Sequence, residues 1–577
     1  MIAFLEDRRA PQGEPAAWRF EDGFSCLTVV DRDSLDAALA EMAAQPAWTV
    51  MSLTYELGYL LEPKSAPQGW APDGSALARF WRFHRCDVLT AEDASAWLKA
   101  SVPAGVSGVG GVQSGIARAD YLNAVDRIQA LIAAGDCYQV NYTFPLAFEW
   151  FGAPLGVYAQ LRQWQPVRYG GVVCDKACGI VSLSPELFVE RRGAHLRTRP
   201  MKGTAPIEEA PEVLRQSLKN RAENLMIVDL LRNDLGRIAT PGSVRVERLF
   251  ELEDYPTVRQ MVSEVSANVG QASFSEVLHA LFPCGSITGA PKIRAMQIIG
   301  ELEQTPRAGY TGAFGWMAPN GDLRLNVAIR TLELAADHVG TMGVGSGIVA
   351  DSDGADEWQE CLLKAAFLRR ADPALGLIET LRREAGVYPR LVGHLVRLKR
   401  SAAWLGFALD ESALLAALQA QPESGIWRVR VLLAANGELT VSAHPLGDEP
   451  AGPRAAVLAE ARIDSRHPLR RHKTTDRALY DQALQQCAAD PTLFDVIFLN
   501  ERGEVAEGAR SNVFVARDGI LLTPPVSSGA LPGVLRADLL ASGEARECIL
   551  RPEDLQGGFW LGNALRGMVH VTLRSTG

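Results

Sequence analysis

The sequence lacks three features that would each indicate a class of protein: an excess of positive charge, a long apolar run and a secretory start. Its 577 residues carry 58 Lys and Arg against 68 Asp and Glu, a formal net charge of −10. This balance argues against non-specific binding to nucleic acid, which requires a basic surface. No apolar run is long enough to cross a bilayer, and the first residues, MIAFLEDRRAPQ, lack a signal-peptide pattern. We therefore expect a cytoplasmic protein with neither nucleic-acid nor membrane partners.

Paired cysteines and nucleotide-binding glycine motifs are also missing. The nine cysteines are scattered, and the close pair Cys174 and Cys178 has neither zinc-type spacing nor further ligands nearby. We therefore expect free thiols in a reducing cytosol. The glycine run GVGSGIVAD (343–351) is not a GxGxxG motif and no helix pattern follows it, so a dinucleotide-binding interpretation is excluded.

A break in composition at Asp372-Pro373 divides the chain. The helical pattern DEWQECLLKAAFLRRA (356–371) ends there, and short strands with charged turns follow. Because 577 residues are too many for one ordinary core, we expect two domains, 1–372 and 373–577. The first mixes strands with helices, including one helix predicted over 211–236, and its Gly/Ser/Val run at 102–115 is typical of a loop or linker. The predicted class is α+β.

Carboxylates and flexible segments in the first domain are candidates for a site. Glu357 and Glu360 are three residues apart, so a helix places both on one face, and Glu223 lies in another helical pattern. These groups are either ordinary solvated charges or ligands of Mg²⁺, which prefers oxygen and keeps water for its substrate. The glycines of 343–351, which follow and partly lie in a predicted strand, and the segment CGSITGAPKIRAM (284–296) suit an anion; for 284–296 the alternative is a plain Gly/Pro loop.

Lys202 occupies a constrained turn, RPMKGT (199–204). A lysine there is a solvated charge, an anchor for an anion or a nucleophile, and the local sequence leaves all three open. A nucleophilic lysine must first lose its proton, because its ordinary pKa is about 10.4.

The order of motifs along the first domain resembles that of the chorismate-utilising enzymes, which include anthranilate synthase and aminodeoxychorismate synthase component I. The motifs are GDCYQVN, SLSPE, RPMKGT, AENLMIVDLLRNDLGR, FPCGSITGAPKIRAMQIIGELE, GYTGAFGW, AIRTLE, GSGIVADS and DEWQECLLKA. They extend from about residue 118 to 370, and residues 1–117 match more loosely. The resemblance implies a large α/β sandwich with chorismate and Mg²⁺ in a central cleft.

The resemblance also implies roles for individual residues. Glu223 and Glu360 would bind Mg²⁺, with Glu357 close by. Glu186, in SLSPE, would protonate a departing hydroxyl group as a general acid. The residues that would contact the chorismate carboxylates are Ser286, Thr288, Tyr310, Arg330, Gly345 and Gly347.

Two positions distinguish the branches of this family. Gln139 stands where water-adding members carry a lysine, which indicates addition of ammonia. Lys202 stands where anthranilate synthases have the alanine of PIAGT. A lysine in that slot resembles aminodeoxychorismate synthase, in which it is thought to attack C2 of chorismate while the C4 hydroxyl leaves. The alternative is a lysine that only anchors a carboxylate. Arg259 and Gln260 replace a histidine that many relatives carry, so no histidine acid is expected there.

The second domain carries its own set of motifs. RRHKTTDRALYDQAL (470–484) places Lys473 before a helical stretch, and VAEGARSN (505–512) follows a predicted hairpin. A lone lysine is most often a surface residue. Together with the upstream amphipathic helix GHLVRLKRSAAWLGF (393–407), however, this layout resembles the fold-type IV pyridoxal-phosphate enzymes. That group includes branched-chain and D-amino-acid aminotransferases and aminodeoxychorismate lyase.

By this resemblance, Lys473 would form the Schiff base with pyridoxal 5'-phosphate, and Glu507 would pair with its pyridine nitrogen. Arg566, in LGNALRGMV, would bind a substrate carboxylate. The groups that would bind the cofactor phosphate are Arg397, Ser511, Asn512 and the backbone N–H groups of Gly533, Val534 and Leu535.

Together the two resemblances predict an enzyme that converts chorismate and ammonia to 4-amino-4-deoxychorismate and then eliminates pyruvate to give 4-aminobenzoate for folate biosynthesis. The sequence carries no amidotransferase motif, so ammonia would come from a separate glutamine amidotransferase subunit or from solution. The first alternative is an anthranilate synthase-type chorismate aminase with an aminotransferase-like tail. A second is a non-catalytic C-terminal domain that only binds a partner. A homodimer through the second domain stays open.

Overall fold

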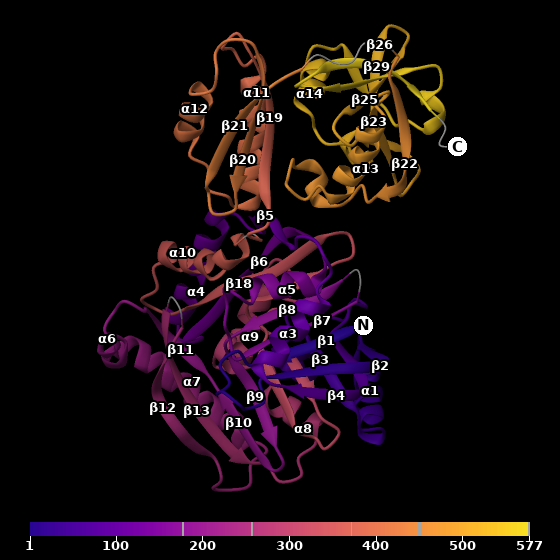
Figure 1. Cartoon of the computed structure of the whole chain (residues 1–577). Coiled ribbons are helices and arrows are strands. Elements are labelled where there is room, and N and C mark those ends of the chain that lie inside the picture. The colour runs from indigo at the N-terminus through magenta and orange to yellow at the C-terminus, as the bar shows by residue number, and fades with distance from the viewer. Residues whose placement is uncertain (176–177, 256–257, 371, 448–452, 575–577) are drawn as a thin grey trace. The chain divides into compact units, whose positions relative to one another are not determined.

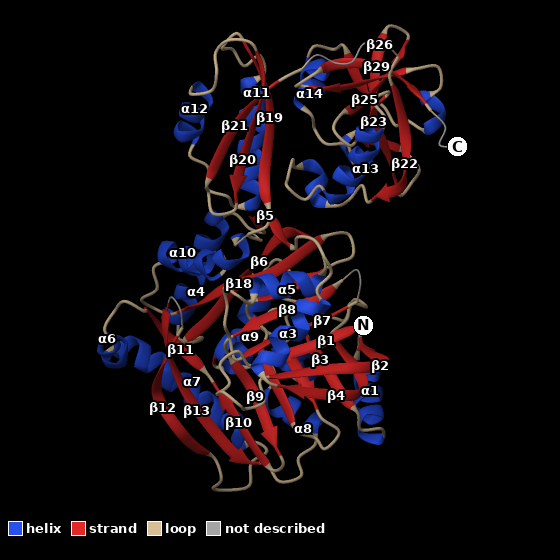
Figure 2. Ribbon diagram, in the orientation of Figure 1, coloured by secondary structure: helices blue, strands red, loops and turns tan. Residues whose placement is uncertain are grey.

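The computed structural model describes residues 1–175, 178–255, 258–370, 372–447 and 453–574 (Figure 1). Contacts divide the chain into two compact units. Unit 1 comprises Met1–Pro103, Val112–Phe148 and Ala153–Leu368, and unit 2 comprises Ala104–Gly111, Glu149–Gly152 and Arg369–Gly577. Both units combine helices with many strands (Figure 2). Every helix of the described ranges is too short or too polar to span a membrane.

The strands in the first two thirds of the chain are mostly antiparallel. They are β1 (Ile2–Glu6), β2 (Ala17–Val29), β3 (Trp48–Leu53), β4 (Ala78–Leu89), β5 (Gly108–Ser114), β6 (Gln139–Phe151), β7 (Tyr169–Cys174), β8 (Gly179–Ser184), β9 (Leu187–Arg192), β10 (His195–Arg199), β11 (Met201–Pro206), β12 (Arg245–Asp254), β13 (Val258–Asn268), β14 (Gly289–Ala290), β15 (Ala313–Met317), β16 (Leu323–Val327), β17 (Thr331–Leu334) and β18 (Val339–Ile348). One series of neighbours runs β2–β4–β3–β15–β16–β9–β10–β13, and another runs β7–β8–β17–β18–β6–β14. Strand β1 pairs with both β2 and β7 and so joins the two series.

Helices cover these strands. They are α1 (Arg32–Ala44), α2 (Leu57–Leu61), α3 (Ala91–Ser101), α4 (Arg118–Ala133), α5 (Pro154–Leu161), α6 (Pro211–Gln216), α7 (Leu218–Gly236), α8 (Phe274–Leu281), α9 (Lys292–Leu302) and α10 (Gly354–Lys364). The prediction of one helix over 211–236 is wrong in one respect, because Ser217 ends α6 and begins α7. Its side chain accepts a hydrogen bond from the backbone N–H of Asn220, the preferred role of serine at a helix start. Ile227 and Leu231 of α7 then pack into the main core with Val265 of β13.

The three glycines of 343–347 lie inside strand β18, as the predicted strand over this stretch requires. Their absence of side chains makes room for neighbours. A Cβ on Gly343 would lie 2.1 Å from Cγ of Tyr310, and one on Gly347 would lie 2.2 Å from Nε2 of Gln139. The glycines thus admit the side chains of Tyr310 and Gln139 to this face of the strand.

Unit 2 contains two sheets. Their strands are β19 (Gly376–Glu384), β20 (Ile426–Ala434) and β21 (Leu439–Pro445) in one, and β22 (Ala455–Ile463), β23 (Leu493–Asn500), β24 (Val505–Gly508), β25 (Asn512–Arg517), β26 (Ile520–Thr523), β27 (Ala545–Glu547), β28 (Phe559–Asn563) and β29 (Gly567–Leu573) in the other. The helices are α11 (Leu391–Leu405), α12 (Glu411–Gln419), α13 (Ala478–Ala489) and α14 (Val534–Ala541). Leu377 and Val429 of the first sheet form a core with Leu398 and Leu405 of α11.

Two short segments from the first half of the chain complete unit 2. Within the run at 102–115, predicted as a loop or linker, residues 108–114 form strand β5, and residues 104–111 belong to unit 2. Gly110 and Gly111 lie directly against the ring of Trp404. Glu149 accepts hydrogen bonds from Nε1 of Trp404 at 3.1 Å and from Arg471 at 2.6 Å. These segments therefore support the region that leads into Lys473.

We predict that Gly110→Ala destabilises unit 2, because its added Cβ would lie 2.3 Å from Cζ3 of Trp404. Overpacking of this kind costs about 1–3 kcal/mol, which calorimetry of the full chain would record as a lower transition midpoint. Gly447→Ala is the matched control, because its Cβ would meet no described heavy atom within 4 Å. We expect this control to change stability by less than about 0.5 kcal/mol. Equal stability of the two variants would contradict the packing of Trp404 on Gly110.

Candidate active sites

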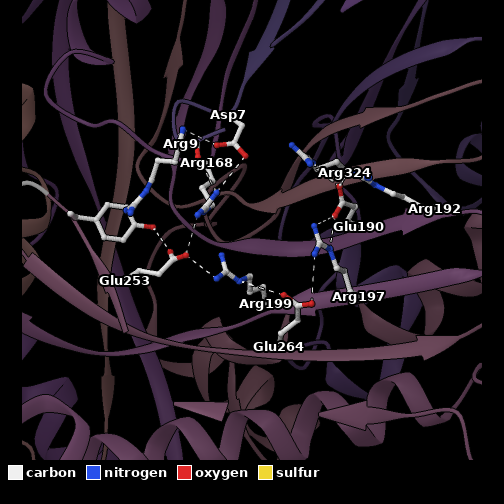
Figure 3. Close-up of polar contacts among 11 residues, drawn as sticks. Asp7, Arg9, Arg168, Glu190, Arg192, Arg197, Arg199, Glu253, Glu264 and Arg324 are labelled. Atoms are coloured by element: carbon white, nitrogen blue, oxygen red, sulfur yellow. Dashed lines mark hydrogen bonds and ion pairs between the residues drawn. The ribbon is translucent and has the colours of Figure 1, made fainter. Parts of the chain in front are cut away.

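Buried ion pairs hold the end of β10, three residues before Lys202 in β11. Arg199, the last residue of β10, pairs with Glu253 of β12 at 2.8 Å, and its side chain is only 12% exposed. Figure 3 shows Glu253 between Arg199 and Arg168, which lies 3.4 Å from the same carboxylate. Lys202 lies inside β11, so the predicted turn is wrong: the strand continues to Pro206, and its pairing with β13 is irregular around Gly203, whose φ of +97 favours glycine. The position of Lys202 is thus fixed on both sides.

The charge of Lys202 acts on three carboxylates from different elements. Burial raises the pKa of Glu186 and of Glu223, and Lys202 opposes this effect at both. Burial also acts on Glu360 of α10, but Lys364, 2.8 Å away, and Lys202 together bring the pKa of Glu360 below its ordinary value. A lysine and several acids of different proton affinity therefore share one region.

Glu186, between β8 and β9, is buried and accepts a hydrogen bond of 2.6 Å from the hydroxyl of Ser286. Its raised pKa allows the carboxyl group to keep a proton, as a general acid requires. Ser286 lies in a short 3-10 helix, Gly285–Ile287. Thr288 follows it, fully buried, and its hydroxyl donates to the carbonyl of Gly285 at 3.2 Å.

Gln139 begins β6 and carries a buried amide oxygen that no described group satisfies. Gln139 is 2% exposed, and its Oε1 has no hydrogen-bond partner among the described residues. Pairing of Gln139 with Ala290, and a hydrogen bond of 2.8 Å from Asn141 to the carbonyl of Thr288, bring β6 beside the Ser286 segment. A buried unpaired acceptor is costly, so Oε1 is suited to receive an N–H or O–H donor.

Tyr310 and Arg330 lie close together beside the glycine face of β18. Arg330 has φ +50 and donates to Oε1 of Gln165 at 2.5 Å. Burial lowers the pKa of Arg330, and Tyr310 opposes that effect. Nζ of Lys364 donates to the carbonyl of Gly345 at 2.8 Å and also pairs with Glu360, so α10 is tied to β18. Contacts therefore link all the residues predicted for the first site into one region.

The predicted magnesium ligands come from α7 and α10. Glu357 accepts a hydrogen bond of 2.9 Å from Ser352, and its charge raises the pKa of Glu223 further beyond the effect of burial. Among the described residues, no group of three or more acids, histidines or cysteines is arranged to hold a metal ion. The carboxylates fit only a Mg²⁺ ion that takes one or two protein ligands and completes its shell with water and substrate.

Unit 2 contains a cavity of about 560 Å³ into which Lys473 faces. Burial and the charges of Arg477 and Arg397 lower the pKa of Lys473 to about 7. The backbone around Lys473 is fixed by a hydrogen bond of 2.8 Å from Ile378 of β19 to its carbonyl. The preceding His472 stacks on Trp404, with ring centroids 4.4 Å apart. Lys473 is therefore a well-positioned amine that is largely neutral above pH 7.

The other residues predicted for this site, except Leu535, also line the cavity, and most are already held by neighbours. Glu507 is buried and accepts hydrogen bonds from the hydroxyl of Tyr480 and from the backbone of Leu531, the latter at 2.8 Å. Burial raises the pKa of Glu507. Two guanidinium nitrogens of Arg397, Nε and Nη2, donate to the carboxylate of Glu379, at 2.8 and 2.6 Å.

The predicted phosphate-binding groups meet at one end of the cavity. Ser511 donates to Asp495 at 2.5 Å, and Asn512 donates to the carbonyl of Leu531 at 2.9 Å. Helix α14 begins at Val534, with Leu535 next, so its first N–H groups lie beside these side chains. Arg566 lies in the turn between β28 and β29 and also lines the cavity.

Comparison with known proteins identifies both parts of the chain. Residues 24–370 match the family model of chorismate binding enzymes. The chain belongs to the chorismate binding enzyme family. Residues 376–573 match the model of class IV amino-transferases. Both resemblances, and the predicted fold of a chorismate-binding domain followed by a class IV aminotransferase-like domain, are confirmed.

Three relatives show how far the similarity extends. Aminodeoxychorismate synthase component 1 of Klebsiella aerogenes is 40% identical over 276 residues, which are 46% of this chain and 61% of that protein. Anthranilate synthase component 1 of Pseudomonas aeruginosa is 40% identical over 262 residues, 44% of this chain and 53% of that protein. The structure of anthranilate synthase component I from Streptococcus pneumoniae TIGR4 is 26% identical, with a TM-score of 0.53 over 62% of this chain and 93% of that chain. The chain thus spans 61% and 53% of the two curated relatives, and identity alone does not separate their activities.

The class IV match implies pyridoxal phosphate as the cofactor of this chorismate binding enzyme's second unit. The cavity fits that group, because it contains a lysine of lowered pKa, a buried acid and a helix start within one space.

Sequence reasoning missed two side chains that hold this site. Tyr480, which donates to Glu507, lies seven residues after Lys473 and carried no motif. Glu379 pairs with Arg397 and His394, and these charges bring its pKa to about 2 despite burial. The strand sequence LIETL offered a signal, because alternation places Glu379 on the buried face, where an acid needs a cationic partner.

We predict that Lys473 in the cofactor-free chain reacts as an unusually acidic lysine. Reductive methylation requires a neutral amine, so its rate at Lys473 should be half-maximal near pH 7 and fall at lower pH, where the amine is protonated. Mass spectrometry of the modified peptide measures this rate. Nα-acetyl-lysine is the reference, because its ε-amine has an ordinary pKa of about 10.4. The same pH profile for both amines would contradict the environment described here.

Proposed function

We propose that unit 1 aminates chorismate at C4 and that unit 2 removes pyruvate from the product, so that the chain makes 4-aminobenzoate for folate biosynthesis. The observation that carries this proposal is the placement of Lys202 in β11 beside Glu186 and Glu223, between the buried ion pair of Arg199 and the strand irregularity at Gly203. The functional division lies at residues 1–372 and 373–577, with short segments of the first part supporting the second.

In the first reaction the amine of Lys202, after giving up a proton to a base, attacks C2 of chorismate. The ring double bonds shift, and the C4 hydroxyl takes a proton from Glu186 and leaves as water. Ammonia then adds at C4, the double bonds shift back, and the C2–N bond to Lys202 breaks. The net change is chorismate plus ammonia giving 4-amino-4-deoxychorismate plus water. The raised pKa of Glu186 supports its role as the acid.

Other residues of unit 1 bind and orient the reactants. The unpaired Oε1 of Gln139 can accept a hydrogen bond from ammonia, which has N–H groups to donate. Ser286, Thr288, Tyr310 and Arg330, with the backbone of Gly345 and Gly347, surround the position proposed for the chorismate carboxylates. Glu223 and Glu360, with Glu357 nearby, would hold Mg²⁺, which supplies positive charge to the ring carboxylate. Ammonia comes from a separate glutamine amidotransferase subunit.

In the second reaction Lys473 removes the C4 proton of 4-amino-4-deoxychorismate, and the enolpyruvyl group leaves C3 as pyruvate while the ring becomes aromatic. Pyridoxal phosphate, when bound, supplies an electron sink for this elimination. The lowered pKa of Lys473 supports its role as a base near neutral pH. Glu507 would face the cofactor ring nitrogen. Arg397, Ser511, Asn512 and the start of α14 would face its phosphate, and Arg566 a substrate carboxylate.

A second candidate function is synthesis of anthranilate, favoured by the 40% identity to an anthranilate synthase component 1. It requires amination at C2 with no covalent lysine. We rank it second because Lys202 would then have no chemical role, and because a class IV partner domain has no use for anthranilate.

We predict that the full chain, supplied with chorismate, Mg²⁺, ammonium and pyridoxal phosphate, forms 4-aminobenzoate and pyruvate in equal amounts. Chromatography of the products measures both. Chelation of Mg²⁺ should stop formation of both products from chorismate and leave pyruvate release from added 4-amino-4-deoxychorismate intact, because only the first reaction is proposed to use the metal. Accumulation of anthranilate instead would exclude the proposal.

We also predict that Lys202→Ala lowers amination by at least about a hundredfold, as expected for loss of a nucleophile. Lys202→Arg should be equally inactive, because guanidinium keeps the charge but is not a nucleophile. Lys219→Ala is the matched control, since the charge of Lys219 also acts on Glu223 and Glu360. We expect a loss of less than about fivefold there, in line with a screened surface charge. Activity restored by arginine would mean that Lys202 only anchors a carboxylate.

A further inference from the structure

One face of the three-stranded sheet in unit 2 is cationic and lines the cavity. Strand residues alternate between faces, and Val429 and Val431 of β20 point into the core with α11. Arg428 and Arg430 therefore point to the opposite face, and both line the cavity that contains Lys473. Neither residue was a candidate on sequence grounds.

Positive charge dominates the cavity wall. Seven arginines and Lys473 line it, against three carboxylates. Most of these arginines have partners: Arg397 pairs with Glu379, and Arg477 lies 3.6 Å from Asp481. Arg428 and Arg430, by contrast, form no hydrogen bond or ion pair within the described ranges, and both are exposed to the cavity.

The neighbours of these two arginines offer no compensating acid across the strands. Arg428 is directly opposite Arg382 of β19 on one side and His444 of β21 on the other. Arg430 is opposite Thr380 and Ser442. Like charges directly opposite each other destabilise a sheet, and Arg382 already pairs with Glu384. An anion in the cavity would relieve the repulsion.

The register fixes where this anion would lie relative to Lys473. Ile378 of β19 donates to the backbone of Lys473, and Thr380, two residues further along, is opposite Arg430. Two residues of a strand span roughly 6.6–6.8 Å. Arg430 and then Arg428 therefore extend away from the reactive amine in steps along one face. A ligand whose amine meets the site of Lys473 would present a distant acidic group to these arginines.

We propose that Arg428 and Arg430 bind a carboxylate of the substrate remote from its reacting amine and thereby select a dicarboxylate amine over a monocarboxylate one. The inference rests on the proposed function, in which the substrate carries its amine and a ring carboxylate at opposite ends of a six-membered ring and a second carboxylate on the enolpyruvyl group. Arginine suits this task because its planar fork matches a carboxylate. Arg566, on a different element, would take the second carboxylate.

The test compares binding of two unreactive probes to the chain loaded with pyridoxal phosphate. The dicarboxylate is 4-amino-3-(carboxymethoxy)benzoate, and the monocarboxylate is (2-aminophenoxy)acetate, which lacks only the ring carboxylate. Binding is followed by the absorbance of the bound cofactor, which reports unit 2 alone. The parent should prefer the dicarboxylate. In the variant carrying Arg428→Gln and Arg430→Gln, the dissociation constant of the dicarboxylate should rise at least about tenfold, as for loss of a charge-assisted hydrogen bond. The dissociation constant of the monocarboxylate should change less than about twofold.

Arg546→Gln is the matched control, because Arg546 is also an exposed strand arginine but does not line the cavity. It should bind both probes like the parent. The single variants Arg428→Gln and Arg430→Gln give the same comparison if the double variant folds poorly, and Arg430→Lys should recover part of the preference.

Four results would overturn the inference: no preference in the parent, an unchanged dicarboxylate constant in the variants, equal weakening of both probes, or loss of bound cofactor. The last would assign the arginines to the cofactor phosphate. Because the probes do not react, a chain that fails to make 4-aminobenzoate still gives a clear answer here. A chain that makes 4-aminobenzoate but shows no preference would overturn this inference and leave the proposed function standing.

Discussion

Buried charge and its compensation control the geometry of unit 1. An arginine removed from water must have an acidic partner, since an unpaired buried charge costs several kcal/mol (about 3–5 when one partner is removed). Arg199 has Glu253, which also serves Arg168 (Figure 3). This pair fixes the end of β10, and β11, which carries Lys202, begins two residues later. The position of Lys202 therefore depends on charges outside the proposed reaction.

The two lysines proposed to act in catalysis lie in opposite electrostatic surroundings. The charge of Lys202 lowers the pKa of three carboxylates from different parts of the chain. Such carboxylates can bind protons or a hard cation. Lys473 lies near Arg397 and Arg477, and these charges with burial favour its neutral form. A group of acids suits a site that must protonate a leaving hydroxyl. A group of cations suits a site that must bind phosphate and carboxylates and keep an amine ready to take a proton.

Motif order alone predicted which segments come together around both candidate sites, because the family spacing fixes the order of these segments along the chain. Lys202, Glu186 and Ser286 do lie together, and Lys473, Glu507 and Arg397 do share one cavity. Local patterns failed where long-range packing decides. Arg428 and Arg430 alternate with valines, and only the second sheet determines that their face meets a cavity rather than solvent. Residues 104–111 have the composition of a linker, and nothing local predicts that Trp404, some 290 residues later, lies on their glycines.

Strand β6 has a consequence for how this chain can change over evolutionary time. Its first residue, Gln139, belongs to unit 1, whereas Glu149–Gly152, at and just beyond its end, belong to unit 2. An insertion or deletion within the strand would move Gln139 and Glu149 relative to each other and reverse the faces of one end. Changes in the length of β6 are therefore constrained by both units. A gene split at residue 373 would not yield two independent halves, because the piece released would leave its supporting segments behind.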